Sequence, residues 1–224
     1  MKQSKWKEIL TSNQMFIVYI IVVLCIAISM KTPAFAEVST IITLARALLV
    51  TLCFAICEMV VIISGGIDVS FPAIACASLY IPICVFKEND IDNVVLAFVF
   101  AAAIGLVIGI INAVLISLLQ IPPLIATLGV SSITQGMLLT FFGTRQISRL
   151  PSTIAALNKV YLFTYQSKAG NNYSMTALIL VPIILYIVVY IVLKYTMLGR
   201  GIYAIGGDAN AARIAGFNVV RLQF

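Results

Sequence analysis

The run VVLAFVFAAAIGLVIGIINAVLISLL, residues 94–119, decides the fold class of this chain. It contains no charged residue, and it exceeds the about 20 apolar residues that an α-helix needs to cross the hydrocarbon core of a bilayer. Because no water is present there, a spanning segment must satisfy its backbone polar groups internally, as a single α-helix does. The run therefore predicts a transmembrane helix.

Five more apolar runs lie on either side of this one. They occupy residues 15–30, 41–63, 70–86, 124–142 and 176–194. The composition agrees, because 62% of the 224 residues are hydrophobic and 10% are charged, whereas about 25% are charged in a soluble domain. We therefore expect an all-α polytopic protein with about six transmembrane helices in a lipid bilayer.

The charged flanks give the expected orientation. Six crossings put both termini on one side of the membrane, and the lysines within residues 2–7 favour the cytoplasm by the positive-inside rule. We expect residues 1–14 to be a cytoplasmic N-terminus, 15–194 the transmembrane region and 195–224 a cytoplasmic loop. The small residues at 34–36 resemble a cleavage site, so a signal peptide is the alternative for the first run.

The remaining composition argues against several classes of function. The net charge is +6, but the basic residues are scattered between apolar runs, which indicates interfacial anchoring and not nucleic-acid binding. The chain has no histidine, the commonest metal ligand and neutral-pH proton shuttle. All five cysteines lie inside apolar segments, so no disulfide framework is indicated. We expect no metal site, no cofactor and no enzymatic activity.

Two interruptions break the apolar pattern between spans. In SGGIDVS, residues 64–70, paired glycines allow a sharp turn before the third span. In IPP, residues 121–123, paired prolines bar helical continuation and form a stiff elbow before the fifth span. The structural-motif residues that we expect here are Gly65, Gly66, Asp68, Ser70, Pro122 and Pro123.

Polar side chains inside the spans are candidates for a translocation path. The fifth span carries three of them at four-residue spacing, and such a stripe either lines a wet path or bonds to neighbouring helices. In the fourth span one asparagine adjoins a stripe of small residues, which favours close packing of helices within this subunit or with a second copy. The path candidates are Asn112, Thr127, Ser131 and Gln135, and the small stripe comprises Ala97, Ala101, Gly105, Gly109 and Ala113.

The segment 198–219 has the layout of a short capped helix outside the lipid. Asp208 can act as the N-cap, residues 209–215 are mostly strong helix formers, and Gly216 stands where a left-handed residue ends a helix. A helix of about 10 Å is marginal in water. We therefore expect it to be held by something against which it docks.

In this order the motifs resemble the permease subunits of bacterial ATP-binding-cassette importers for simple sugars, of the ribose, xylose, galactoside and autoinducer-2 type. The matching segments are GGIDVS (65–70), PPLIATLG (122–129), GR (199–200), YAIGG (203–207) and AARIAG (211–216). Their order and spacing extend over residues 41–219. Such permeases continue with further membrane helices, so we expect this chain to lack the C-terminal part.

The resemblance implies one half of an importer in a bacterial inner membrane. Two permease chains would form the pore, cytoplasmic ATPase subunits would hydrolyse ATP, and an extracytoplasmic sugar-binding protein would deliver the sugar. The segment 208–216 is similar to the coupling helix that contacts the ATPase, with a small apolar face for docking and an arginine available for a carboxylate. The coupling residues so implied are Asp208, Ala211, Ala212, Arg213, Ile214 and Gly216.

An ion-coupled secondary transporter is the alternative function. Such proteins place carboxylates or broken helices near the membrane midplane, whereas Glu58 and Asp68, the only acids in or beside the spans, are not central. Glu58 is expected to be a polar packing contact or interfacial anchor, and Arg46 is expected to extend to the outer interface. No Gly-rich loop ending in Gly-Lys-Ser/Thr is present, so ATP hydrolysis is expected from a separate subunit.

Overall fold

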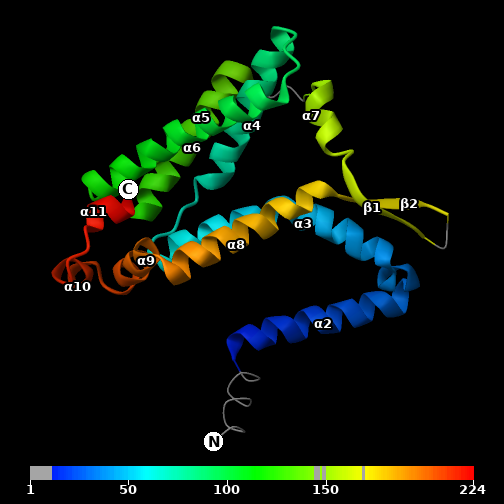
Figure 1. Ribbon diagram of the computed structural model, residues 1–224, viewed down its shortest axis with the longest axis horizontal. Coiled ribbons are helices and arrows are strands. Elements are labelled where there is room, and N and C mark those ends of the chain that lie inside the picture. The colour runs from blue at the N-terminus through cyan, green and yellow to red at the C-terminus, as the bar shows by residue number, and fades with distance from the viewer. Residues whose placement is uncertain (1–11, 144–146, 148–149, 168–169) are drawn as a thin grey trace, which may run out of the picture. The chain divides into compact units, whose positions relative to one another are not determined.

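The structure is a computed structural model that describes residues 12–143, 147, 150–167 and 170–224 (Figure 1). The chain divides into two compact units. Unit 1 comprises Met1–Ala47 with Leu162–Met175, and unit 2 comprises Leu48–Tyr161 with Thr176–Phe224.

Within the described residues, five helical segments are long and apolar enough to cross a membrane. They are α3 (Val38–Ile63), α4 (Phe71–Glu88), α5 (Val94–Ala113) with the π-helical turn η2 (Val114–Leu118), α6 (Pro123–Phe142), and the 3-10 turn η3 (Ala177–Ile179) with α8 (Leu180–Tyr195). The first predicted crossing corresponds to α2 (Asn13–Lys31), whose apolar part, Met15–Lys31, is shorter. The 3-10 turn η1 (Pro33–Ala36) follows it. The all-α membrane fold is thus confirmed.

In unit 2, α4 packs against both α5 and α6 (Figure 1). A methyl group added to Gly105 of α5 would lie 3.3 Å from Oγ of Ser78 in α4. The rings of Phe86 and Phe100 meet edge to face, with centroids 5.6 Å apart. At this point the small-residue stripe therefore serves packing inside the subunit, whereas a methyl group on Gly109 would meet nothing within 4 Å.

Both predicted interruptions of the apolar pattern are confirmed. Gly65 has a φ of +85°, which is open to glycine at little cost, and it turns the chain after α3. Pro122 and Pro123 occupy the N-cap and first position of α6, where a missing N–H breaks no helical bond. Before them Gln120 adopts a φ of +55°, so the elbow begins at the end of η2.

The sequence marks residues 143–174 only as a polar stretch, but the structure contains a helix and a hairpin there. They are α7 (Ser152–Leu157), β1 (Tyr161–Gln166) and β2 (Asn172–Thr176), and the two strands pair. The hydroxyls of Thr164 and Ser174 are 2.9 Å apart, so these side chains share a face. Because side chains alternate along a strand, the opposite face is mainly aromatic. It carries Tyr161, Phe163, Tyr165, Tyr173 and Met175.

Arg46 has a protein partner that the sequence does not indicate. Within unit 1 its Nη1 donates a hydrogen bond of 2.9 Å to the carbonyl oxygen of Ser174 in the hairpin. Nearby, Ser167 donates a bond of 2.7 Å to the Glu37 carboxylate. The guanidinium therefore has a protein acceptor, which lowers the cost of placing a charge in a span.

The last part of the chain contains more structure than one short helix in a loop. Three helices follow α8: α9 (Met197–Gly207), α10 (Ala209–Ile214) and α11 (Val219–Gln223). The predicted helix corresponds to α10. The sequence prediction missed α9 because its four glycines weaken the helical signal.

Candidate functional site

Three motifs that are far apart in the sequence meet at the end of α3. A methyl group on Gly66 would lie 3.5 Å from Cβ of Pro123. One on Gly65 would lie 3.3 Å from Cα of Gly206 in α9. The glycine turn, the proline elbow and the segment leading to α10 therefore form one assembly within unit 2.

A polar network, residues 58, 68, 70, 112 and 127, holds the segment after the glycine turn; we call it the polar node. Glu58 and Asp68 are partly buried, and the other three residues are buried. Oδ1 of Asp68 accepts hydrogen bonds from the N–H (2.7 Å) and the hydroxyl (2.6 Å) of Ser70. Asn112 of α5 donates from Nδ2 to Oγ of Ser70 at 2.7 Å. The backbone N–H of Asp68 donates to Oε1 of Glu58 at 3.2 Å. The node thus links α3 to α5 through the irregular segment.

The fifth member of the node comes from α6. Oγ1 of Thr127 accepts a hydrogen bond of 3.3 Å from the N–H of Val69. Ser70 is fully buried, and Thr127 and Asn112 are 1% and 6% exposed. Irregular backbone at membrane depth is tolerated only where protein or water satisfies it. Of the four predicted path residues, Thr127 therefore satisfies that backbone directly, and Asn112 supports it through the Ser70 side chain.

The other two path candidates lie further along α6. Ser131 is buried and accepts a bond of 3.3 Å from Nε2 of Gln135. Gln135 itself is exposed on the helix surface, about 18 Å along α6 from its first residue at 1.5 Å per residue. An exposed amide at that depth requires a polar environment, because hydrocarbon offers it no hydrogen-bond partner.

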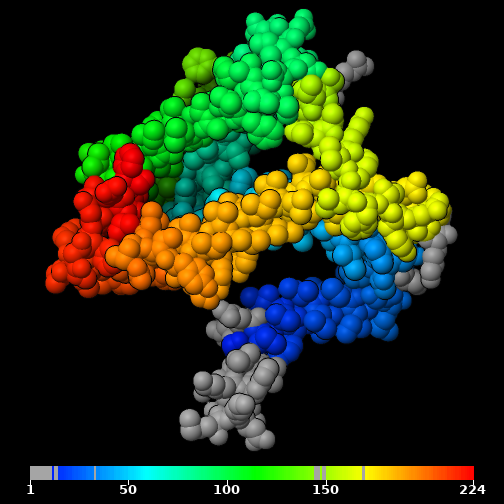
Figure 2. Space-filling model, viewed as in Figure 1, coloured from blue at the N-terminus to red at the C-terminus, as the bar shows by residue number. Residues whose placement is uncertain are grey.

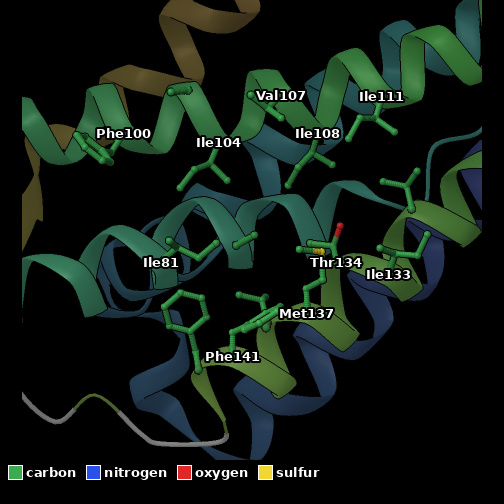
Figure 3. Close-up of a pocket in the computed structure, with 15 residues that line it drawn as sticks. Ile81, Phe100, Ile104, Val107, Ile108, Ile111, Ile133, Thr134, Met137 and Phe141 are labelled. Carbon is green, nitrogen blue, oxygen red and sulfur yellow. The ribbon is translucent and has the colours of Figure 1, made fainter.

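A cavity of about 620 Å³ lies between α4, α5 and α6. Figure 3 shows Ile104 and Ile108 of α5 facing Ile81 of α4 and Met137 of α6 across it. Among the described side chains that line it, Thr134 supplies the only hydroxyl. A polyhydroxyl solute needs many hydrogen-bond partners, so this cavity is unsuited to a sugar.

The short helix α10 has both predicted caps. Oδ1 of Asp208 accepts hydrogen bonds from the N–H groups of Asn210 (2.7 Å) and Ala211 (3.2 Å). At the other end Gly216 has a φ of +90°, and the next N–H, that of Phe217, donates to the Ala212 carbonyl at 3.0 Å. These bonds satisfy backbone groups that a helix of six residues would otherwise leave open.

A small apolar core joins α10 to its neighbours. Ile205 of α9, Ala212 of α10 and Val219 of α11 are buried against one another. Figure 2 shows the three helices gathered in one block, coloured from orange to red. Ala212 is 3% exposed, so of the predicted coupling residues it is the one turned into its own chain.

The opposite face of α10 is open. Ile214 is 89% exposed, and Ala211 and Arg213 are also exposed. An isoleucine so fully exposed beside an arginine on a rigidly capped helix is a suitable contact for another protein.

Glycines allow α9 to approach two spans at backbone distance. A methyl group on Gly206 would overlap the carbonyl oxygen of Ile63 at the end of α3. One on Gly199 would overlap the carbonyl oxygens of Val192 and Leu193 at the end of α8. A third, on Gly201, would lie 2.7 Å from the tip of Leu222 in α11. The helix that carries α10 is thus in direct backbone contact with the glycine turn.

A protein-family model described as "Branched-chain amino acid transport system / permease component" matches residues 9–224. The chain belongs to this permease family. The predicted resemblance to import permeases is therefore confirmed at the level of the family. With five span-length helices among its described residues, this permease is a multi-pass protein of the inner membrane.

Curated relatives of this permease carry sugar-import names. The galactose/methyl galactoside import permease protein of Salmonella typhimurium is 28% identical over 70% of this chain and 47% of the relative. The fructose import permease protein of Rhizobium meliloti is 30% identical over 74% and 45%. The ribose import permease protein of Bacillus subtilis is 29% identical over 90% and 59%. The relatives are permease proteins and not enzymes. The chain spans about half the length of these relatives, and no solved structure matches it.

One anchoring residue of this permease was not predicted. Asp92, in the loop between α4 and α5, accepts hydrogen bonds from the N–H groups of Ser152 (3.2 Å) and Thr153 (3.0 Å) and from both hydroxyls. The side-chain bond from Ser152 and then those from Thr153 lower the pKa of Asp92 from its usual 3.8 to about 2. The two segments are about 60 residues apart, so no local pattern signals this contact.

Proposed function

We propose that this chain is the membrane-spanning permease subunit of an ATP-driven importer for a simple sugar. Its partners would be a cytoplasmic ABC ATPase, a second permease subunit and an extracytoplasmic sugar-binding protein. The observation that carries the proposal is the meeting of the glycine turn, the proline elbow and α9 at one place. The family match and the sugar-import names of the relatives support it.

In this proposal α10 is the coupling helix and residues 195–224 are cytoplasmic. Ile214 inserts into an apolar cleft of the ATPase, and Arg213 pairs with a carboxylate at its rim. Asp208 and Gly216 keep the helix formed, and Ala211 allows close approach because it is small. Ala212 contributes indirectly by packing α10 onto α9.

Force would travel from α10 through α9 to the polar node. When ATP closes the ATPase dimer, α10 moves with it. Because Gly206 and the end of α3 are in backbone contact, α9 cannot move without displacing the Gly65 turn. Asp68 and Ser70 then carry the displacement to α5, through Asn112. This gives alternating access a continuous physical route.

The translocation path would run along the exposed part of the α6 stripe. Gln135 offers an amide to a sugar hydroxyl, and Ser131 holds that amide by a hydrogen bond. Thr127 and Asn112 would maintain the hydrogen bonds of the polar node at one end of the same path.

Thiol labelling and ATPase capture test the coupling role. Cysteine at position 214 (Ile214→Cys) should react with a membrane-impermeant maleimide in inside-out vesicles and not in right-side-out vesicles. Capture of the importer's ATPase subunit should fall several-fold in Gly216→Val, because valine strains a left-handed position at a cost of about 1 kcal/mol or more.

Gly216→Asn is the matched control, since asparagine tolerates the left-handed region and should retain capture. A methyl group at Gly216 would meet nothing within 4 Å, so the two variants differ in backbone strain and not in packing. Labelling of position 214 from the outside, or equal capture by both variants, would contradict the proposal.

The ion-coupled alternative has less support. Glu58 and Asp68 each use one carboxylate oxygen to accept the hydrogen bonds that hold the irregular segment, which gives both acids a structural role. Uptake that survives ATP depletion and collapses with the ion gradient would favour this alternative.

A further inference from the structure

A second cavity lies where α3, α8 and α9 come together, apart from the polar node and from α10. Its volume is about 440 Å³. Two cations, Lys194 and Arg200, and three tyrosines line it together with apolar side chains from α3 and α8. None of the eight described residues that line it is acidic.

The tyrosines and the lysine form an ordered stack along α8. The rings of Tyr186 and Tyr190 are nearly parallel, with centroids 6.3 Å apart. Nζ of Lys194 lies 4.9 Å from the centre of the Tyr190 ring and contacts its hydroxyl. These contacts hold the ammonium at the cavity without neutralising its charge.

The basic residues of the cavity stand at the end of a span-length helix, where the headgroup level of a bilayer is expected. Lys194 is in the last turn of a membrane span, and Arg200 is in the first turns of the helix that follows it. Tyr190 and Tyr186 lie about 6 and 12 Å deeper along α8, at 1.5 Å per residue. Tyrosine and basic residues together mark the membrane–water interface, and basic pockets between spans bind anionic headgroups.

We propose that this cavity binds the phosphate group of an anionic phospholipid. Lys194 and Arg200 donate charged hydrogen bonds to the phosphate oxygens, and Tyr203 adds a phenolic donor from α9. An acyl chain lies along the apolar wall formed by Met59 and Ile63. The lipid would thus bridge α8 and α9 at the junction that positions α10.

Lipid binding at this cavity is separate from sugar import, and it can be measured without a transport assay. The full chain is purified in mild detergent and titrated with phosphatidylglycerol, and bound lipid is counted by native mass spectrometry. The parent chain should bind one phosphatidylglycerol more tightly than phosphatidylcholine. The double variant Lys194→Gln/Arg200→Gln should weaken phosphatidylglycerol binding by about 10-fold or more, because each basic residue contributes to headgroup attraction.

Two further variants separate charge at the cavity from general charge and from misfolding. Lys87→Gln/Arg221→Gln removes the same charge elsewhere and should bind as the parent does. Tyr203→Phe removes one hydroxyl, keeps the ring that packs at the cavity, and should weaken binding about threefold. It tests the site even if the double variant fails to fold.

Three outcomes would overturn the proposal. The control pair could weaken binding as much as the cavity pair, which would indicate nonspecific attraction. Phosphatidylcholine could bind as tightly as phosphatidylglycerol. Inorganic phosphate could displace the lipid at equal concentration, which would identify a site for soluble anions.

Discussion

Two helices of this permease, α7 and α10, are both six residues long, but their N-terminal caps come from different parts of the chain. In α10 the cap is Asp208, the residue directly before the helix, and bonds at Gly216 close the other end. In α7 the preceding residue is Pro151, which makes no cap, and the carboxylate of Asp92 arrives from another loop. One span-length helix, η3 with α8, separates α7 from α10 along the chain, so we expect the two on opposite sides of the membrane.

The difference in capping determines how each helix responds when neighbouring segments move. A locally capped helix remains formed while it moves, which suits an element that transmits force as a rigid piece. A helix capped from a distant loop depends on the position of that loop, because it loses its cap when the loop moves. We therefore expect the structure of α10 to depend on its own caps together with its packing on α9, and the structure of α7 to depend on Asp92 from a distant loop.

The largest loss of stability should come from disturbing the contact between α9, which carries α10, and the end of α3. In Gly206→Ala the added methyl group overlaps the Ile63 carbonyl oxygen, which is backbone and cannot yield as a side-chain tip can. The free energy of unfolding should fall by about 1–3 kcal/mol, the usual cost of overpacking. Denaturation of the purified chain followed by circular dichroism measures it.

Gly207→Ala is the matched control, since its methyl group would meet nothing within 4 Å. Alanine also favours a helix over glycine, so this variant should equal or exceed the parent in stability. Equal losses in the two variants would show that the backbone contact with α3 is unimportant.

Removing the local cap should have a smaller and confined effect. Asp208→Ala should destabilise α10 by about 1 kcal/mol, because two N–H groups lose their acceptor. Amide hydrogen exchange should quicken in residues 209–214 and stay unchanged in α7. Asp208→Asn keeps an acceptor oxygen and should exchange as the parent does. Faster exchange in α7 as well would break the contrast between the two helices.

The smallest effect is the pH response of α7. The pKa of Asp92 is lowered to about 2, so its carboxylate stabilises the docked helix above pH 3.8, and this contribution is lost as the pH falls from about 3.8 to about 2. A fluorophore attached at Ala156→Cys should become mobile in that interval, as measured by anisotropy. In Asp92→Ala it should be mobile at every pH, whereas Glu88→Ala should behave as the parent does. A transition only above pH 4 would contradict the role of Asp92.

The features that the sequence predicted correctly depend on residues within one or two turns of one another. Long apolar runs determine the spans, and paired glycines or prolines determine where they break. The caps of α10 belong to the same class, because Asp208 and Gly216 act on backbone groups at most a few residues away.

The helix α9 was missed because its glycines weaken a local signal, whereas the contacts that were missed need a partner distant in the chain. Gly206 was quoted in a motif, but its contact with Ile63 depends on α9 being folded against α3. The polarity of Asn112 and Thr127 is visible in the sequence and makes them path candidates, whereas their partners, Ser70 and the N–H of Val69, are found only in the structure.

By itself the sequence determined that this chain crosses a membrane several times, where its helices break, and that a short helix follows the last span. The tertiary structure decided that the glycine turn, the proline elbow and α9 converge, and that Asp92 caps α7. The physical reason is the distance along the chain over which each interaction acts. Burial in lipid and capping act on each segment alone, whereas a hydrogen bond or a close backbone approach exists only after folding brings two distant segments together.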